Sequence, residues 1–289
     1  MPSPHDPLKG EHASTYIVAD RRNSQELTRL TIQDHAITTA MGGVLPEQSN
    51  TTIFQRALDV GCGSGSWVIE AAQAYPAMSL VGIDISQRMV DYARAQASSQ
   101  QVADRVEFLV MDAILKLDFP SDSFDLVNMR LGSSFLRTWD WPNVLGELLR
   151  VIRPGGILRI TEVEIGVECA SPAVQRFFEM DRCAFYRSGH LFTQERSGVT
   201  SQLERLLRQY GFRQVQTQAY TIENRAGTTE GQAIYDDLRY AFQTARPFFQ
   251  KWGCICEDYD AIYKQALNEM RQPDFLALTF LLTAWGTKL

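Results

Sequence analysis

The sequence lacks the features of a membrane-spanning, secreted or nucleic-acid-binding protein. No apolar run approaches the roughly 20 residues that cross a bilayer, and the first thirty residues hold no apolar run of signal-peptide length. The apolar stretch 275–285 is short enough to be a buried strand. Basic residues are scattered and the formal net charge is -6, which disfavours a phosphate-binding surface. We therefore expect a cytoplasmic protein with no membrane and no nucleic acid as partner.

Cysteine and histidine are scarce. Five cysteines make an odd number, and a chain of 289 residues can bury a core without disulfide bonds. Cys254 and Cys256 have neither a second cysteine pair nor a nearby histidine, so no metal site is predicted and both are interpreted as packed thiols. These features favour a reducing compartment.

Between residues 56 and 166, short β-branched runs alternate with longer helical segments. The runs predict five strands, at 56–60, 79–83, 106–111, 124–129 and 157–162. Apolar residues at helical spacing predict three helices between them, at 64–74, 86–98 and 140–152. The last helix should end where Pro154 stops it, and Gly155 and Gly156 should allow a tight return into the next strand. This alternation is typical of βαβ units and a parallel sheet.

The flanking segments add helices and two late strands. A helical pattern precedes the sheet at 24–41, and the later pattern predicts helices at 172–186, 198–210, 229–251 and 259–270 and strands at 212–222 and 275–285. The expected fold is a doubly wound, mostly parallel α/β sheet of seven strands with an antiparallel edge hairpin. We divide it into an N-terminal helical lid (1–50), a Rossmann-like core (51–227), a helical cap (228–272) and a final core strand (273–289).

A glycine-rich turn follows the first predicted strand. Gly61, Gly63 and Gly65 lack a Cβ, so they can fold tightly beneath a ligand at the start of a helix. The spacing is G-x-G-x-G, whereas a dinucleotide site has G-x-G-x-x-G. Asp59, two positions before the first glycine, would repel a pyrophosphate and attract an ammonium group. The turn therefore does not predict an NAD site.

A carboxylate ends the second predicted strand. Asp84 follows Gly65 by about 20 positions, the offset of a ribose-binding acid, and a carboxylate can accept hydrogen bonds from vicinal hydroxyls. A helix cap is the alternative role at this point, and Ser86 is better placed for it, directly before an apolar helix. Asp84 is thus predicted to bind ribose, with Ile85 beside it.

The run 57–65, Ala-Leu-Asp-Val-Gly-Cys-Gly-Ser-Gly, resembles the first motif of the class I, Rossmann-like S-adenosylmethionine-dependent methyltransferases, which reads D-V-G-C-G-x-G after a strand. The resemblance extends over about 56–162. It implies S-adenosyl-L-methionine as cofactor, with Asp59 near its amino group and Gly61 and Gly63 lining it.

Further residues are assigned by the same resemblance. Asp112 and Ala113 resemble the pair that contacts adenine, although Asp112 could also be a turn residue. Asn128 and Arg130 end the fourth strand under the cofactor; Arg130 could bind the cofactor carboxylate or an anionic substrate, or could form a salt bridge to a neighbouring acid.

The N-terminal segment is similar to the lid of small-molecule members of this family, which suggests Tyr16 and Gln33 as cofactor contacts. If the acceptor is a hydroxyl, a general base would help, and His190 is the candidate among the four histidines. A lone loop histidine is, however, often simply exposed.

Aromatic residues beyond position 170 are the main indication of the acceptor. They either line an apolar pocket or form the core of the cap, and they are Phe177, Phe178, Phe185, Tyr186, Phe192, Tyr235, Tyr240, Phe242, Phe248, Phe249 and Trp252. We expect O-, N- or C-methylation of a small apolar or aromatic acceptor by a monomer or homodimer.

Two alternatives remain. One is a protein of this fold that binds the cofactor without methyl transfer, as a pericyclase or cyclase. The other is a protein or RNA methyltransferase, which is disfavoured by the low basic content and by the run Asn128-Met129-Arg130-Leu131 where base-directed members have N-P-P-Y.

Overall fold

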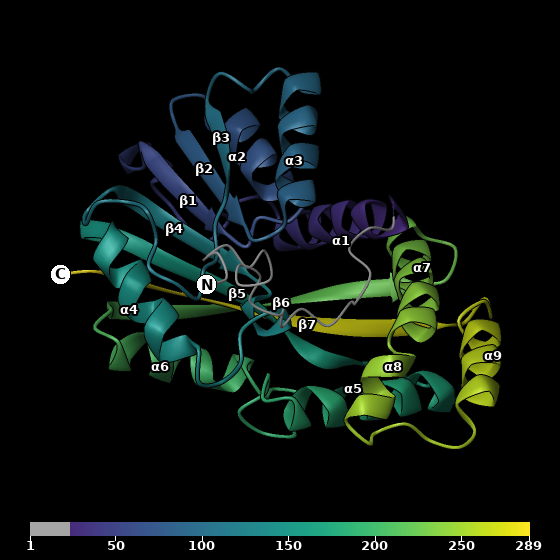
Figure 1. Cartoon of the computed structure of the whole chain (residues 1–289). Coiled ribbons are helices and arrows are strands. Elements are labelled where there is room, and N and C mark those ends of the chain that lie inside the picture. The colour runs from purple at the N-terminus through teal and green to yellow at the C-terminus, as the bar shows by residue number, and fades with distance from the viewer. Residues whose placement is uncertain (1–23) are drawn as a thin grey trace, which may run out of the picture.

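One sheet of seven strands organises residues 24–289, the part of the chain that this computed structural model describes (Figure 1). The strands are β1 (Arg56–Val60), β2 (Ser79–Asp84), β3 (Val106–Val110), β4 (Phe124–Arg130), β5 (Ile152–Cys169), β6 (Arg213–Arg225) and β7 (Leu276–Thr287). Their order is β3-β2-β1-β4-β5-β7-β6. β1 to β5 are parallel, and β7 is antiparallel to both β5 and β6. The predicted fold class is confirmed.

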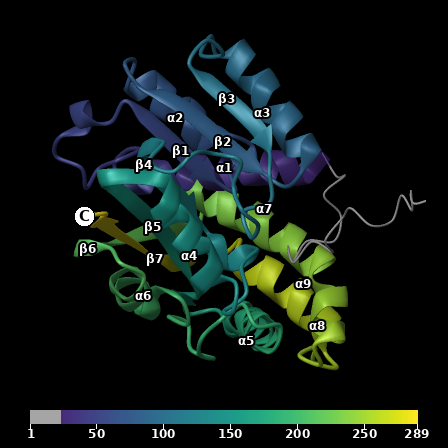
Figure 2. The same cartoon turned by 60° about the vertical axis from the view of Figure 1, so that its left-hand side comes forward.

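Helices cover both faces of the sheet (Figure 2). They are α1 (Ser24–Met41), α2 (Ser66–Ala74), α3 (Gln87–Ser99), α4 (Trp141–Val151), α5 (Pro172–Arg187), α6 (Leu203–Gln209), α7 (Thr229–Thr244), α8 (Arg246–Lys251) and α9 (Tyr259–Glu269), with short 3-10 turns η1 (Thr51–Ile53), η2 (Gly132–Ser134) and η3 (Thr200–Gln202). Side chains alternate along β1: Ala57 packs with α2 and α3, whereas Leu58 and Val60 pack with α4 and α6. Two buried cores, one on each face, hold the sheet.

β5, β6 and β7 are longer than the other strands and extend past the core (Figure 1). The predicted fifth strand ended at residue 162, but β5 continues to Cys169 because β7 supplies an antiparallel partner along this extension. The pairing is irregular between Val163 and Val167, where Gly166 has φ +136°. A third core of α5, α7, α8 and α9 packs on these strand ends.

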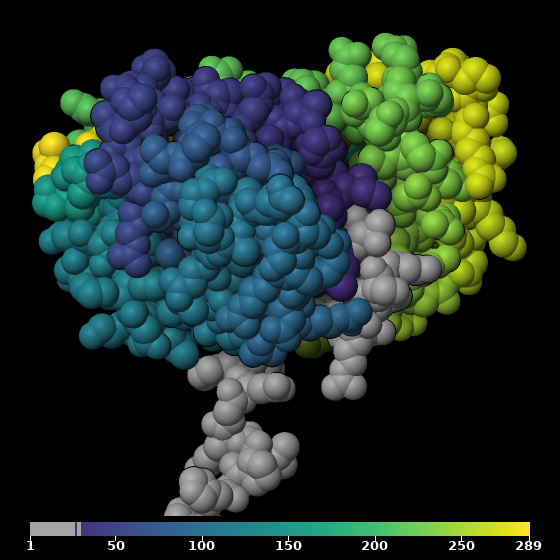
Figure 3. Space-filling model, turned by 90° about the horizontal axis from the view of Figure 1, so that it is seen from above, coloured from purple at the N-terminus to yellow at the C-terminus, as the bar shows by residue number. Residues whose placement is uncertain are grey.

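The helical insertion between β6 and β7 differs in detail from the prediction. The single helix predicted over 229–251 is two helices, α7 and α8, which meet at Ala245. Pro247 lies in the first turn of α8 and has no N–H to continue the hydrogen bonds of α7, so the chain bends there. On the other side, α1 lies against α7 and β6, and Figure 3 shows α1 in purple beside the green of this insertion.

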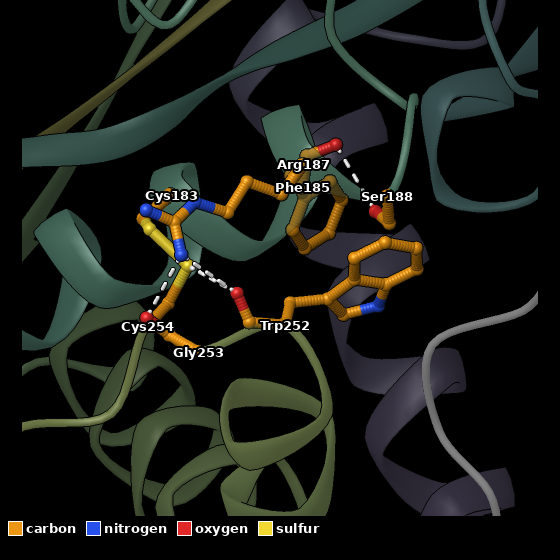
Figure 4. The surroundings of a disulfide bond; sticks show 7 residues. All are labelled: Cys183, Phe185, Arg187, Ser188, Trp252, Gly253 and Cys254. Atoms are coloured by element: carbon orange, nitrogen blue, oxygen red, sulfur yellow. Dashed lines mark hydrogen bonds between the residues drawn. A yellow bond between two sulfur atoms is a disulfide. The ribbon is translucent and has the colours of Figure 1, made fainter.

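A disulfide bond between Cys183 and Cys254 corrects the interpretation of Cys254 as a free thiol. Cys183 is in α5, Cys254 lies between α8 and α9, and their Cα atoms are 5.8 Å apart (Figure 4). Next to the bond, Arg187 donates hydrogen bonds to the carbonyl oxygens of Trp252 (2.9 Å) and Gly253 (3.0 Å). Sequence spacing could not indicate this pair, since 71 positions separate the two cysteines. Together these contacts fasten α5 to the inserted helices.

Over residues 24–289 no helix has the length and apolar character needed to cross a membrane. Across the same residues, no group of three or more His, Cys, Asp or Glu side chains is arranged to hold a metal ion.

Candidate active site

A cavity of about 600 Å³ opens at the carboxyl ends of β1, β2 and β4 and continues between α1, α5 and α7. Its first half is lined by the glycine turn, the end of β2 and the loop after β3. Its second half is lined by the extension of β5 and by α5 and α7. Ligands of open α/β sheets bind at the carboxyl ends of strands, and the volume suits a small molecule.

The glycine turn forms the wall below the first half. Gly61 and Gly63 have φ values of +70° and +52° and both line the cavity. A Cβ on Gly61 would lie 2.9 Å from the Phe135 ring, whereas nothing lies within 4 Å of the position of a Cβ on Gly63. Gly65 is not part of the lining: its missing Cβ lets Ala93 of α3 approach, since a Cβ there would lie 2.7 Å from that methyl group. Gly65 thus serves helix packing.

Asp84 is held at the end of β2 by two backbone groups. Its Oδ2 accepts a hydrogen bond from Gly63 N (3.1 Å) and its Oδ1 accepts one from Ser86 N (2.8 Å). Ser86 occupies the N-cap position of α3, as expected, but its side chain makes no capping hydrogen bond. Asp84 and Ile85 both line the cavity, so the carboxylate is oriented by the same turn that forms the floor.

The loop after β3 forms a mostly apolar ledge. Asp112 and Ala113 line the cavity together with Met89 and Met111. Asp112 Oδ1 accepts a hydrogen bond from Ile114 N (2.9 Å), so this residue also stabilises its own turn. This part of the wall therefore presents three apolar side chains and one carboxylate to the cavity.

A buried polar chain holds Asp59 from behind. Asn128 Nδ2 donates to Asp59 Oδ1 (2.7 Å), Arg159 Nη1 donates to Asn128 Oδ1 (2.7 Å), and Arg159 Nε donates to Glu47 Oε1 (2.6 Å). Burial raises the pKa of Asp59 to about 7, against the opposing effects of Arg130 and Asn128. Asp59 lines the cavity, whereas Asn128 lies behind it and is absent from the lining, which gives Asn128 a positioning role.

Glu47 and Arg159 were not among the site residues predicted from the sequence. Their ion pair is almost fully buried, with 2% and 1% of the side-chain surfaces exposed. The sequence did contain an indication of this cluster, because Asp59, Asn128 and Arg159 each interrupt a run of apolar residues. In the structure the three are register partners on the adjacent strands β1, β4 and β5.

Arg130 forms a salt bridge to a neighbouring acid, one of the three roles considered for it. Its Nη2 lies 2.9 Å from Asp34 Oδ1 and its Nη1 donates to Thr38 Oγ1 (3.0 Å), which ties β4 to α1. Gln33 lies on the same helix and lines the cavity, at the position expected of a lid residue. Tyr16 lies outside the described residues.

His190 is not on the cavity wall, and its proposed role as base is not retained. Only 1% of its surface is exposed, and its Nδ1 lies 2.8 Å from the carbonyl oxygen of Ser133. Burial lowers its pKa, and its ring packs against Phe185. The histidine is therefore neither an exposed loop residue nor a residue that faces a substrate; it joins η2 to the end of α5.

Four of the eleven aromatic residues singled out after position 170 line the second half of the cavity: Phe177, Phe178, Phe185 and Tyr240. Others, such as Phe242 and Phe249, are buried in the core of the inserted helices. Both expected roles of these aromatic residues are thus realised. Two acids that the sequence analysis did not single out, Asp181 and Asp237, share the same wall.

Comparison with known proteins identifies the family of the chain. Residues 57–156 match a family model described as a methyltransferase domain. The O-methyltransferase rstn1 of Aspergillus nomiae is 31% identical over 171 residues, which are 59% of this chain and 69% of that protein. The 27-O-demethylrifamycin SV methyltransferase of Amycolatopsis mediterranei is 37% identical over 124 residues, which are 43% of each chain.

The fold is shared with a structure of phosphoethanolamine N-methyltransferase 2 of Haemonchus contortus that holds S-adenosylhomocysteine. The TM-score is 0.57 at 19% identity, over 96% of this chain and 61% of that one. The glycine turn, Asp84 and the ledge after β3 line the first half of the cavity, within or next to the matched residues 57–156. The chain belongs to the class I, Rossmann-like S-adenosylmethionine-dependent methyltransferases.

Proposed function

We propose that the protein transfers the methyl group of S-adenosylmethionine to a hydroxyl oxygen of a small apolar or aromatic acceptor. One observation carries the proposal: a single cavity joins the glycine turn to the aromatic wall of α5 and α7. Two relatives are named for transfer to oxygen, the rstn1 protein and the demethylrifamycin enzyme.

The first half of the cavity fits the cofactor by its chemistry. Asp84 offers a fixed carboxylate to vicinal hydroxyls, and the space beside Gly63 leaves its backbone open to a ligand. Asp59, whose pKa burial raises to about 7, gains a counter-charge when an ammonium group approaches, so binding favours its ionised form. When bound, the cofactor supplies a methyl group already activated by its sulfonium sulfur.

The residues of the chain then align the acceptor and exclude water. Phe177, Phe178 and Phe185 present apolar surface from α5, and Ile234 and Leu238 do so from α7. Holding the acceptor oxygen in line with the methyl group replaces a bimolecular encounter, which is the main source of rate in a displacement of this kind. The mostly apolar wall supports a small acceptor with a ring or short chain.

Transfer of a labelled methyl group to candidate acceptors tests this proposal. The full-length protein is incubated with methyl-labelled S-adenosylmethionine and a panel of phenols, hydroxy acids and amines. We expect label in the products of hydroxyl compounds and none when their O-methyl ethers are supplied. Asp84→Ala, checked for fold by circular dichroism, is the control that should lose labelling at low cofactor concentration.

The alternative outcomes are distinct. Label confined to amines would assign nitrogen as the acceptor atom, and label in added protein or RNA would replace the small-molecule proposal. A rearranged acceptor without label, formed only when the cofactor is bound, would identify a cofactor-dependent cyclase.

A further inference from the structure

Asp181 is a carboxylate within an apolar stripe of α5. Phe177, Asp181 and Phe185 follow one another at a spacing of one helical turn, and all three line the second half of the cavity. From the other side α7 contributes Ile234 and Leu238. An acid at this point of the wall is not needed for packing.

No hydrogen bond or ion pair links Asp181 to another residue in the part of the chain that the structure describes. Arg182, its neighbour in sequence, is turned to β5, where Nη1 donates to the carbonyl oxygen of Ile165 (3.3 Å). Burial raises the pKa of Asp181 to about 7; Arg182 opposes this shift and Asp237 adds to it. The carboxylate is therefore poised to take up or release a proton near neutral pH.

The charges around Asp181 are mostly negative. Asp237 of α7 lies near enough to raise the pKa of Asp181, and Glu164 of β5 lines the same half of the cavity. Tyr259 of α9 is a neutral neighbour, because burial raises its pKa and its hydroxyl donates a hydrogen bond to the carbonyl oxygen of Phe242 (2.6 Å). This surrounding does not stabilise an acceptor that arrives as an anion.

Only two cations, Arg130 and Arg137, are part of the described lining, and each contacts a residue other than Asp181. Arg130 is paired with Asp34 (2.9 Å), and the guanidinium of Arg137 lies 5.5 Å from the centre of the Trp139 ring. Since the pKa of an ordinary phenolic hydroxyl is about 10, a phenol or alcohol enters the cavity as the neutral O–H form near pH 7 and must lose its proton there.

We propose that Asp181 is the residue that accepts the proton of the acceptor hydroxyl, which makes the acceptors of this protein neutral phenols or alcohols that need a base. This inference rests on the proposed function. The O–H bond breaks and its proton moves to a carboxylate oxygen of Asp181. The oxygen lone pair forms the O–CH₃ bond, while the S–CH₃ bond breaks and its electron pair stays on sulfur as a neutral thioether. Asp181 returns the proton to water after product release.

The first test is the pH dependence of methyl transfer to 4-methylphenol and 4-nitrophenol. We expect the wild-type kcat to rise with pH through about 7, because only the ionised carboxylate is a base. Asp181→Asn should lower kcat for 4-methylphenol by about 10²- to 10³-fold with little change in KM, and should remove this pH dependence. The loss should be much smaller for 4-nitrophenol, which ionises without help.

Two further variants separate a chemical role from a structural one. Asp181→Glu keeps a carboxylate and should retain the rise with pH and at least about a tenth of the wild-type kcat. Glu179→Gln removes an acid from the solvent side of the same helix, where it pairs with Arg176 (2.7 Å), and should behave as wild type. Each variant must bind S-adenosylhomocysteine by calorimetry as the wild type does.

The possible outcomes distinguish failure of the role of Asp181 from failure of the proposed function. Labelled product from the wild type with an unchanged pH profile in Asp181→Asn overturns the role of Asp181 and leaves the proposed function intact. No labelled product from any hydroxyl compound with the wild type overturns the proposed function and this inference with it. An equal loss in kcat for both phenols would also overturn it, because it would show damage unrelated to proton removal.

Discussion

The two halves of the cavity are built in different ways. The half that we propose to hold the cofactor, here called the cofactor half, is formed by backbone and short side chains near the strand ends: Gly61, Gly63 and Asp112 lie on turns that follow β1 and β3, and Asp84 is the last residue of β2. The acceptor half is formed by side chains of α5 and α7 and by the extension of β5. The first half is thus positioned by the core sheet, whereas the second depends on helices held by the long ends of three strands.

The largest expected effect concerns the buried chain that supports the cofactor half. Arg159→Met leaves Glu47 buried without its cation and removes the partner of Asn128, so the free energy of unfolding should fall by about 3–5 kcal/mol. Denaturant unfolding measures it. Arg208→Met, which breaks an exposed pair with Glu204, is the matched control and should change stability by less than about 1 kcal/mol. Equal losses would show that the buried chain has no special part in stability.

Loss of the disulfide bond between Cys183 and Cys254 should destabilise the acceptor half. Cys183→Ser removes the bond that links α5 to the loop before α9, and stability should fall by about 2–4 kcal/mol. Cys256→Ser, a free cysteine in the same loop, is the control. Reductant should lower the unfolding midpoint of the wild type and leave that of Cys183→Ser unchanged. Insensitivity of the wild type to reductant would argue against the disulfide in solution.

A third prediction separates the halves by binding. Asp84→Ala should remove the charge-assisted hydrogen bonds that we propose between this carboxylate and ribose, so S-adenosylhomocysteine should bind about 1.5–3 kcal/mol more weakly while the fold is kept. Calorimetry gives the dissociation constant. Asp91→Ala, on the exposed side of α3, should leave it unchanged. An unaltered constant in Asp84→Ala would place the ribose elsewhere.

The reverse experiment changes the acceptor half alone. Phe178→Ala removes aromatic surface from the cavity wall, and the KM for a phenolic acceptor should rise about 10-fold, the equivalent of roughly 1.5 kcal/mol of lost apolar contact. Cofactor affinity should stay as in the wild type. Phe119→Ala, far from this wall on the loop before β4, tests whether any loss of a ring has the same effect. A parallel loss of cofactor affinity in Phe178→Ala would show that the halves are coupled.

The smallest expected effect is a pH dependence at Asp59. Its pKa is raised to about 7 in the folded protein, so the folded state binds a proton that the unfolded state has already lost. The stability that this group contributes is present below about pH 4 and declines as pH rises from about 4 to 7. Asp59→Asn should flatten this part of the stability curve, measured by thermal unfolding between pH 5 and 8. Since an ammonium group pairs only with the ionised form, wild-type cofactor affinity should rise over the same interval and that of Asp59→Asn should not.

Much of the fold was predictable because its determinants are local. The alternation of β-branched runs and helical segments identified βαβ units, and the antiparallel position of β7 followed from two late strands around a helical insertion. The predicted end of a strand was wrong where pairing with a distant strand determines it. β5 extends beyond its predicted end because β7 pairs with it there. A single helix was predicted over 229–251, although Pro247 indicates the break between α7 and α8.

By itself the sequence determined the glycine turn and the acids at the strand ends that line the first half of the cavity, since these are contiguous patterns whose geometry depends on the backbone nearby. Tertiary structure alone decided the roles that depend on distant neighbours. It placed Asn128 behind Asp59, gave Arg130 its partner on α1, buried His190 against η2, and joined Cys183 to Cys254. The tertiary structure also places Asp181 on the cavity wall, although the spacing of apolar residues in α5 indicates only that the helix has an apolar face. A side chain acts according to its burial and its neighbouring charges, and in the acceptor half these come from segments far apart in the chain.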